Sequence, residues 1–481
     1  MNLSAKMNSH KSCLIAMLLS PGLATCQIVS GVPPDYFCAR YGHTATRRGD
    51  SVFVYGGQRE PLAFDGSLLV RVDLSRPWNA FEGGPPMSFV DNNEMSTDPP
   101  SLVQEGGLFL GNDGDIFVYG GGAANFTLNT SSPQPKSFVD NNLRSITQRN
   151  ESWSYLDLGL EATHSPQLGA SAQAGEQGLA FYFNGIIGDE VSREPHPRMI
   201  VLDLREEKAR NVSTAAISPT DARVGATLQY IPGVGKKGVL VLVGGGVRQR
   251  SDDANTHELG GTMAPLNTIH VLDIASLDHG EGTWYQQKTN GRTPAPRADI
   301  CAASIASPDG TGHHIYMFAG RNQTNAFDEV WVLSLPQFRW TKVFNGTHPN
   351  YGGVCQMVGT KQMLVLGGNN VEEPRPQCDK KYKIFLFELT NLKWTPTYVK
   401  DSSPYRVPKA VFEWIGGTGM GEANMTEPEG GFDSQGLAEL FKTTQSASLR
   451  YGRVNAGMRM GRGLGFDLLT LILMLSWVFL W

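Results

Sequence analysis

Before its C-terminal tail the chain lacks any long run of apolar residues at helical spacing, and it also lacks an excess of positive charge. Its 481 residues include 55 glycines and 28 prolines, 40% of them are hydrophobic, and the formal net charge is -5. The missing helical periodicity and the many turn formers favour numerous short strands, and hence an all-β chain. Because there is no basic footprint, nucleic acid is not the expected partner.

A strand-forming segment that ends in glycine recurs along the chain. Its copies are 51–57, 115–122, 179–185, 238–246, 314–320 and 362–368. Self-similarity at roughly 50 to 75 residues is typical of a stacked or circular repeat. We expect each glycine pair to lie at a crowded turn between neighbouring sheets, where a Cβ would clash and a positive φ is required.

The fifth repeat shows the order of elements inside one unit. A strand begins at Arg297, a turn at 308–314 leads to a second strand, 328–335 forms a third, and 338–340 opens a fourth. Four antiparallel strands are too few to fold alone and must pack against copies of themselves. Closing the copies into a ring removes exposed edges, as in a β-propeller.

Third-strand segments such as VRVDL and IVLDL, each with an acidic residue, and a tryptophan at a set distance complete the pattern. With the glycine pairs, they resemble kelch repeats over residues 38–400. The resemblance implies a six-bladed kelch-type β-propeller, or seven blades if 141–160 contains strands of another sheet. The segments FCARYGHTA and YRVPKAVFEWIGG resemble secreted kelch-repeat proteins of fungi. The third repeat departs from the pattern, with FNG in place of the glycine pair.

Tryptophans are expected at the start of the fourth strand of most repeats. We interpret them as wedges between sheets, because a buried indole removes a large apolar area from water, rather than as platforms for a ligand. They are Trp78, Trp153, Trp284, Trp340 and Trp394.

The N-terminus predicts entry into the secretory pathway. Lys6 and Lys11 precede the apolar segment CLIAMLLSPGLA, which ends in small residues, as in a cleaved signal peptide. An uncleaved anchor and a buried helix are the alternatives. Downstream of this segment, seven Asn-x-Ser/Thr sequons predict a glycosylated surface. They stand at Asn125, Asn129, Asn150, Asn211, Asn322, Asn345 and Asn424.

The C-terminus ends in an apolar segment of about 14 to 16 residues, shorter than the roughly 17 to 25 of a spanning helix. Small residues beginning at Asn455, a spacer MRMGRGLG and this tail form the layout of a glycosylphosphatidylinositol signal. A spanning tail would place four arginines on the non-cytoplasmic side, against the usual charge bias. A single tail-anchored helix is the alternative, and 446–448 is a second candidate attachment run.

These features divide the chain into five parts. We expect a signal peptide at 1–26, the propeller at 27–400, an extension docked on it at 401–432, a polar glycine-rich stalk at 433–465 and a hydrophobic tail at 466–481. The expected location is the extracellular face of the plasma membrane or the cell wall.

Cysteine pairing follows from the expected ring. Once the N-terminal segment leaves, Cys38, Cys301, Cys355 and Cys378 remain and allow three pairings. Cys38 precedes the first inner strand, and Cys378 lies in a loop of the sixth blade that leans on the first. We therefore expect a disulfide between Cys38 and Cys378 that closes the ring, with Cys355–Cys378 as the alternative.

Long polar side chains recur at one position near the start of the inner strands. They are Arg40, Gln167, Arg223, Arg297 and Tyr351. If they face the axis, they form a positive ring suited to a carboxylate, a sulfate or a sugar. The alternative is that each arginine binds a neighbouring carbonyl or carboxylate within the sheets.

Enzymatic chemistry has little support in the residues. The resemblance admits a copper-radical oxidase related to galactose oxidase, but no histidine follows His348 and no matching tyrosine and cysteine pair occurs. His313, His314 and the segment from His270 to His279 are interpreted as histidine-bearing turns without metal-ligand spacing, and 251–261 as a solvated loop. We expect no metal or cofactor. The expected function is a cell-surface module that binds protein or carbohydrate, with a secreted oxidase or carbohydrate-active enzyme as the alternative.

Overall fold

The computed structural model describes most of the region expected to form the propeller, and a C-terminal extension. The described residues are 32, 36–38, 40–59, 69–90, 103–111, 114–123, 143–146, 153–158, 160, 165–188, 194–218, 220–252, 256–370 and 383–442. The signal peptide, the first three sequons, Cys378, Asn455 and the hydrophobic tail lie outside them, so these interpretations remain predictions.

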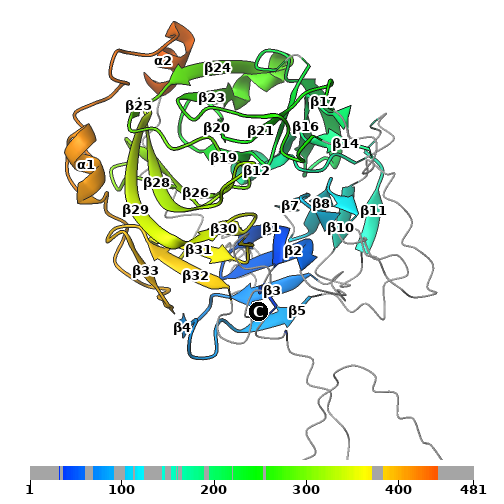
Figure 1. The fold of residues 1–481 in the computed structure, drawn as a ribbon, viewed down its shortest axis with the longest axis horizontal. Coiled ribbons are helices and arrows are strands. Elements are labelled where there is room, and N and C mark those ends of the chain that lie inside the picture. Colours follow the sequence, from blue (N-terminus) through cyan, green and yellow to red (C-terminus); the bar gives the residue numbers. More distant parts are fainter. Residues whose placement is uncertain are drawn as a thin grey trace, which may run out of the picture.

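Within the described residues, six sheets of four or more strands lie around a common centre (Figure 1). Sheet 1 contains β1 (Arg40–Arg48), β2 (Ser51–Arg59), β3 (Val70–Asp73) and β5 (Met87–Phe89). Sheet 2 contains β7 (Gly107–Leu110), β8 (Ile116–Tyr119), β10 (Leu143–Ile146) and β11 (Trp153–Leu156). Sheet 3 contains β12 (Ala170–Ala174), β13 (Leu179–Phe183), β16 (Arg198–Asp203) and β17 (Lys208–Ser213).

Sheet 4 contains β19 (Thr227–Ile231), β20 (Val239–Val243), β23 (Thr268–Asp273) and β24 (Thr283–Lys288). Sheet 5 contains β26 (Cys301–Ala306), β27 (His313–Phe318), β28 (Phe327–Leu335) and β29 (Arg339–Asn350), with β25 (Asn290–Gly291) parallel to β29. Sheet 6 contains β30 (Val354–Val358), β31 (Gln362–Leu366), β32 (Ile384–Glu388) and β33 (Lys393–Thr395). The segment 141–160 supplies the last two strands of sheet 2 and not a separate sheet.

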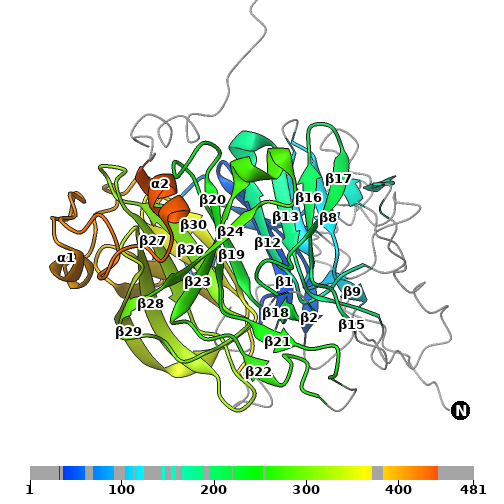
Figure 2. The ribbon, with the colours of Figure 1, turned by 90° about the horizontal axis from the view of Figure 1, so that it is seen from above.

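Shorter strands pair outside these sheets. They are β14 (Ile186–Ile187) with β15 (Glu194–Pro195), β18 (Ala222–Val224) with β21 (Gly246–Arg248) and β22 (Thr262–Met263), β6 (Val103–Gln104) with β9 (Gly122–Ala123), and β34 (Thr397–Tyr398) with β4 (Trp78–Asn79). Figure 2 shows β18, β21 and β22 at one end of the sheets and the helix α2 (Gln435–Lys442) at the other. We call the end with β18, β21 and β22 the mouth face.

Apolar side chains fill the space between each sheet and the next. Separate buried clusters lie between sheets 1 and 2, 2 and 3, 3 and 4, 4 and 5, 5 and 6, and also 6 and 1. Trp340 shows the expected wedge: it is 1% exposed, and its indole N–H donates to the Leu266 carbonyl at 2.9 Å across the boundary between sheets 4 and 5. Because the last of these clusters joins sheet 6 to sheet 1, the arrangement returns to its beginning.

The four glycine pairs lie near the end of the second strand of their sheets, Gly56 and Gly57 within β2 and the others directly after the strand, and all have positive φ. A Cβ on Gly367 would lie 2.5 Å from the carbonyl oxygen of Arg40 in the next sheet, so a side chain is excluded there. The Gly368 N–H donates to that same carbonyl at 2.7 Å. The third repeat uses Asn184 at φ +52°, a conformation that asparagine tolerates better than most residues.

Sheets 6 and 1 are joined by several further contacts. The His43 Nε2 lies 3.0 Å from the Leu366 carbonyl, and the Arg47 guanidinium donates to the Met357 carbonyl at 2.6 Å. Trp78 stacks on Tyr398 where β4 pairs with β34. The prediction for Trp78 was therefore wrong in detail, because this tryptophan lies in β4 and β5 forms the fourth strand of sheet 1.

The C-terminal extension packs against the outside of the ring. Helix α1 (Lys409–Ile415) packs against the cluster of sheets 5 and 6, and α2 buries Leu437 and Phe441 against that of sheets 4 and 5. The Asp433 carboxylate accepts a 2.7 Å hydrogen bond from the Lys288 N–H. A stalk beginning at 433 was therefore wrong, because the chain remains docked through Lys442. Within the described residues, the helices are too short or too polar to cross a membrane.

Candidate functional site

A cavity of about 220 Å³ lies at the centre of the ring. Sheets 1, 3, 4, 5 and 6 line it with their first strands, and sheet 2 lines it with Glu105 and Gly106, just before β7. Side chains of Thr44, Ser171 and Gln229 contribute hydroxyl and amide groups. All six sheets therefore shape one polar cavity, which is the candidate binding site.

One residue from each sheet forms a circle at the mouth of this cavity. These residues have φ between +52° and +67°. We call them the mouth ring: Gly42, Glu105, Leu168, Gly225, Asp299 and Gly352.

Backbone hydrogen bonds connect the mouth ring from one sheet to the next. In each link a backbone N–H donates to a backbone carbonyl of the neighbouring sheet, at 2.7 to 3.1 Å. The donor and acceptor residues are Glu105 and Gly42, Gly42 and Gly352, Gly352 and Asp299, Asp299 and Gly225, and Gly225 and Leu168. Between sheets 2 and 3 the Tyr182 hydroxyl bridges instead, donating to the Glu105 carbonyl at 2.8 Å and accepting from the Gly169 N–H at 3.0 Å. The circle holds the six sheets at defined spacing around the cavity.

The charged side chains that line the cavity are both acidic. Glu105 and Asp299 belong to sheets 2 and 5, and the cavity has no lysine or arginine among its described lining residues. Burial raises the pKa of Asp299 above its usual value, and Arg321 only partly opposes this. The Arg321 guanidinium bonds Asp299 at 2.6 Å and also pairs with Glu258. It lies 4.3 Å above the ring of Tyr351.

The predicted positive ring does not form. Arg40, Arg223 and Arg297 stand at equivalent positions, but none is among the residues that line the cavity. Each donates instead to the carbonyl of the first residue of the glycine pair in its own sheet: Gly56 at 2.6 Å, Gly244 at 3.0 Å and Ala319 at 3.2 Å. Burial lowers the pKa of Arg223 to about 10. These contacts match the alternative interpretation, in which the arginines hold the sheets.

Gln167 and Tyr351 lie one residue away from the arginine position. Gly320 donates to the Asn350 carbonyl as Gly245 donates to that of Arg297, so Asn350 and not Tyr351 is the equivalent residue. The Asn350 amide also takes over the arginine contact, donating to the Gly367 carbonyl at 3.2 Å. In sheet 3 the equivalent carbonyl is that of Pro166. The mouth ring, which the sequence interpretation missed, stands two residues after each arginine.

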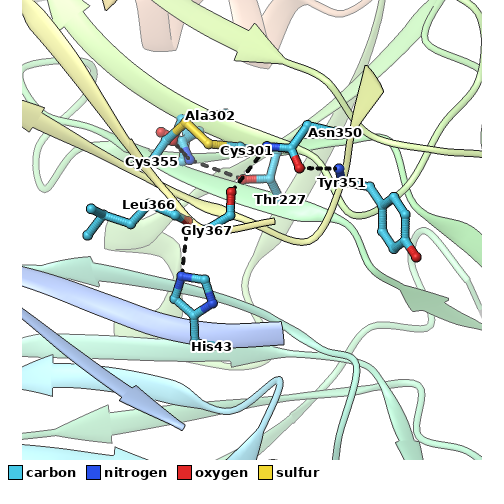
Figure 3. Close-up of a disulfide and its surroundings, with 10 residues drawn as sticks. His43, Thr227, Cys301, Ala302, Asn350, Tyr351, Cys355, Leu366 and Gly367 are labelled. Atoms are coloured by element: carbon cyan, nitrogen blue, oxygen red, sulfur yellow. Dashed lines mark hydrogen bonds between the residues drawn. A yellow bond between two sulfur atoms is a disulfide. The ribbon is translucent and has the colours of Figure 1, made fainter. Parts of the chain in front are cut away.

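A disulfide between Cys301 and Cys355 forms part of the cavity wall (Figure 3). It joins β26 of sheet 5 to β30 of sheet 6, with the two Cα atoms 5.2 Å apart. The alternative pairing of Cys355 with Cys378 was therefore wrong. Cys38 is also disulfide-bonded, but the proposed partner Cys378 lies outside the described residues, so that pairing remains a prediction.

Three of the four histidines interpreted as turn residues lie in buried strands. His313 and His314 belong to β27 and His270 to β23, because the strands begin earlier than their turn signals suggested. Burial lowers the pKa of His314 to about 3, so its ring is neutral at physiological pH. The described part of the chain contains no group of three His, Cys, Asp or Glu side chains that could hold a metal.

The loop at 251–261 is anchored in its described part. The Arg248 guanidinium donates to the carbonyls of Thr256 and His257 at 3.3 Å, and Glu258 binds Arg321. This loop is therefore held beside the mouth ring and is not merely solvated.

The described sequons are accessible. Asn211, Asn345 and Asn424 are exposed, and Asn322 is partly exposed. The Asn322 side-chain carbonyl accepts a 3.1 Å hydrogen bond from the hydroxyl of Thr324, the third residue of its sequon.

Comparison with known proteins agrees with the repeat pattern. Residues 240–412 match the KLHDC2/KLHL20/DRC7 Kelch-repeats domain. The chain is 30% identical over 235 residues to a kelch repeat-containing protein of the fungus Arthroderma benhamiae, over 43% of this chain and 32% of that protein. It is 22% identical over 183 residues to Host cell factor of Drosophila melanogaster, over 36% of this chain and 12% of that protein.

The fold has a solved counterpart. The structure of YjhT superposes with a TM-score of 0.51 at 12% identity, covering 78% of this chain and all of that one. The chain is thus all-β and propeller-like, with a kelch-repeat match in its second half and a kelch-repeat relative in a fungus. It spans about a third of the fungal relative's length. Kelch repeats generally serve as protein-interaction modules.

Proposed function

We propose that this chain is a six-bladed kelch-type propeller that binds protein partners at its mouth face, without catalysing a reaction. The observation that supports this most directly is the mouth ring, in which residues from all six sheets surround one polar cavity. Concave sites with a few convergent polar groups are the usual places for binding. Metal analysis and an oxygen-consumption screen on sugars and aldehydes would overturn the non-enzymatic role if they detected stoichiometric copper and turnover.

Filling the cavity tests where partners bind. Ser171 lines the cavity from β12, so Ser171→Trp places an indole in it, whereas Ser75→Trp places the same group at an exposed loop position. Proteins crosslinked to the wild-type chain should be recovered with Ser75→Trp and lost with Ser171→Trp, while both variants keep the wild-type melting temperature. Equal recovery with the two variants would place the binding surface elsewhere.

The protein partner is proposed to be met outside the cell. Disulfides persist mainly in oxidising compartments, and Cys301–Cys355 adds to the accessible sequons in support of a secreted glycoprotein anchored by a lipid. Digestion with an N-glycosidase should reduce the apparent mass, and a phosphatidylinositol-specific phospholipase should release the protein from intact cells. A fully cytosolic, unglycosylated chain would contradict this part of the proposal.

A further inference from the structure

We infer that the exposed indole of Trp414 is the docking surface for the innermost N-acetylglucosamine of a glycan attached to Asn424. This inference rests on the glycoprotein part of the proposed function and assigns one glycan a place on the protein surface. Both residues belong to the C-terminal extension, Trp414 to α1 and Asn424 to the segment after it, on the outside of the ring (Figure 1). Trp414 is 58% exposed, whereas Val411 and Ile415 of the same helix are buried.

The sequon at 424–426 runs beside the C-terminal end of α1. The Met425 N–H donates to the Ile415 carbonyl at 3.0 Å, which pairs this segment with the last residue of the helix. A Cβ on Gly416 would lie 2.7 Å from the Cβ of Asn424, so the glycine allows the asparagine to lie directly against the chain there. The residue that Asn424 contacts is therefore next but one along the chain to the one that carries the indole.

The Asn424 side chain is available for a sugar. It is exposed, and within the described residues it forms no hydrogen bond. By contrast, the side-chain oxygen of Asn345 accepts a 2.7 Å hydrogen bond from Lys342, and that of Asn322 accepts one from Thr324. A sugar on the Asn424 amide is thus free to turn toward α1.

The Trp414 indole is held in place from one side. The Arg339 guanidinium lies 4.6 Å from the centroid of the indole ring and pairs with the Glu429 carboxylate at 3.4 Å. A cation–π contact of this kind orients the ring. Because the side chain nevertheless remains mostly exposed, the rest of the indole offers a fixed apolar surface to the solvent.

A pyranose ring suits such a surface. One side of N-acetylglucosamine presents several ring C–H groups, and these pack on the electron-rich face of an aromatic ring. The contact removes apolar area of both partners from water, while the hydroxyl groups at the edge of the sugar stay hydrated. The covalent link to Asn424 makes the docking intramolecular, so that a weak contact is enough to hold the sugar on the indole.

Hydroxyl-radical footprinting of the full chain tests this contact. The chain is expressed in a eukaryotic host and trimmed with an endoglycosidase that leaves one N-acetylglucosamine on each occupied asparagine. Oxidation of Trp414 is then measured by peptide mass spectrometry. Thr426→Ala removes the sequon without changing Asn424, and Thr426→Ser is the matched control because it keeps the sequon.

We expect Trp414 to be oxidised about threefold more slowly in wild type and in Thr426→Ser than in Thr426→Ala, because only the first two carry the sugar. Phe81, which is 68% exposed in the loop after β4, serves as the internal reference and should react equally in all three proteins. Equal melting temperatures of the variants confirm the fold.

Three results would overturn the inference, and they bear differently on the proposed function. Equal oxidation of Trp414 in Thr426→Ala and Thr426→Ser, with the sugar present on Asn424 in the second, would show that the sugar does not cover the indole. A bare Asn424 in a chain that carries glycans on Asn211 and Asn345 would remove this site and leave the glycoprotein proposal standing. A chain in which every sequon is bare would remove both.

Discussion

Mild acid should destabilise the propeller, because five histidine side chains are buried in their neutral form. Burial is the main cause in each case, and it lowers their pKa values to between about 3 and about 4. The five are His43, His196, His270, His313 and His314. His43 is the most informative of them because it lies between sheet 1 and sheet 6, where the ring closes.

Proton linkage gives the direction in which the free energy of unfolding changes with pH. Above pH 6.5 these histidines are neutral in both the folded and the unfolded chain, so stability is complete. As the pH falls from 6.5 toward the folded pKa, only the unfolded chain takes up protons, and the free energy of unfolding decreases. Each group removes about 1.4 kcal/mol per pH unit in this window, or about 2 kcal/mol by pH 5. Five such groups together reach the whole stability of a typical domain, about 5 to 15 kcal/mol.

Urea unfolding followed by tryptophan fluorescence at pH 7.5, 6.5, 5.5 and 5.0 measures this loss. His43→Gln keeps a donor for the Leu366 carbonyl but cannot be protonated, so its stability should fall less steeply with pH, by about 1.4 kcal/mol per unit. His348→Gln changes an exposed histidine and serves as the control. A stability that stays constant from pH 7.5 to 5.0, or equal slopes for wild type and His43→Gln, would refute the reasoning.

Three further variants test the ring itself. Replacing Cys301 and Cys355 by serine removes a crosslink across 54 residues and should lower the free energy of unfolding by about 4 kcal/mol, measured by denaturant titration; an unchanged midpoint would contradict this. Gly368 has φ +99°, and Gly368→Ala would place a Cβ 2.1 Å from the Asn350 side chain. Gly83 has a similar φ of +98° but no atom within 4 Å of the position of a Cβ, so Gly83→Ala is the control. Only Gly368→Ala should lower the melting temperature strongly. Arg297→Met breaks a buried pair with Glu329 and should lower the free energy of unfolding by about 3 to 5 kcal/mol, measured by denaturant titration, and an unchanged free energy of unfolding would contradict its role in holding the sheet.

The repeat architecture could be predicted because its signals are local. A strand followed by two residues with positive φ requires glycine or a close substitute, and that requirement is visible in six places. Asn184 and Ala319 show that the conformation is what is maintained, since each takes the position of a first glycine at φ +52° and +62°.

The site depended on register and orientation across sheets, which the chain does not display locally. Pro166 and Asn350, and not Gln167 and Tyr351, are the residues equivalent to the arginines, so the sequence alignment was wrong by one residue. In a strand, a shift of one residue places the side chain on the opposite face. By itself, the sequence determined an all-β repeat with glycines at one recurring turn, because backbone conformation is a property of neighbouring residues. Only the tertiary structure decided that Cys301 meets Cys355, that the arginines turn into the sheets and that Glu105 and Asp299 line the cavity, because these arrangements bring together residues that lie far apart along the chain.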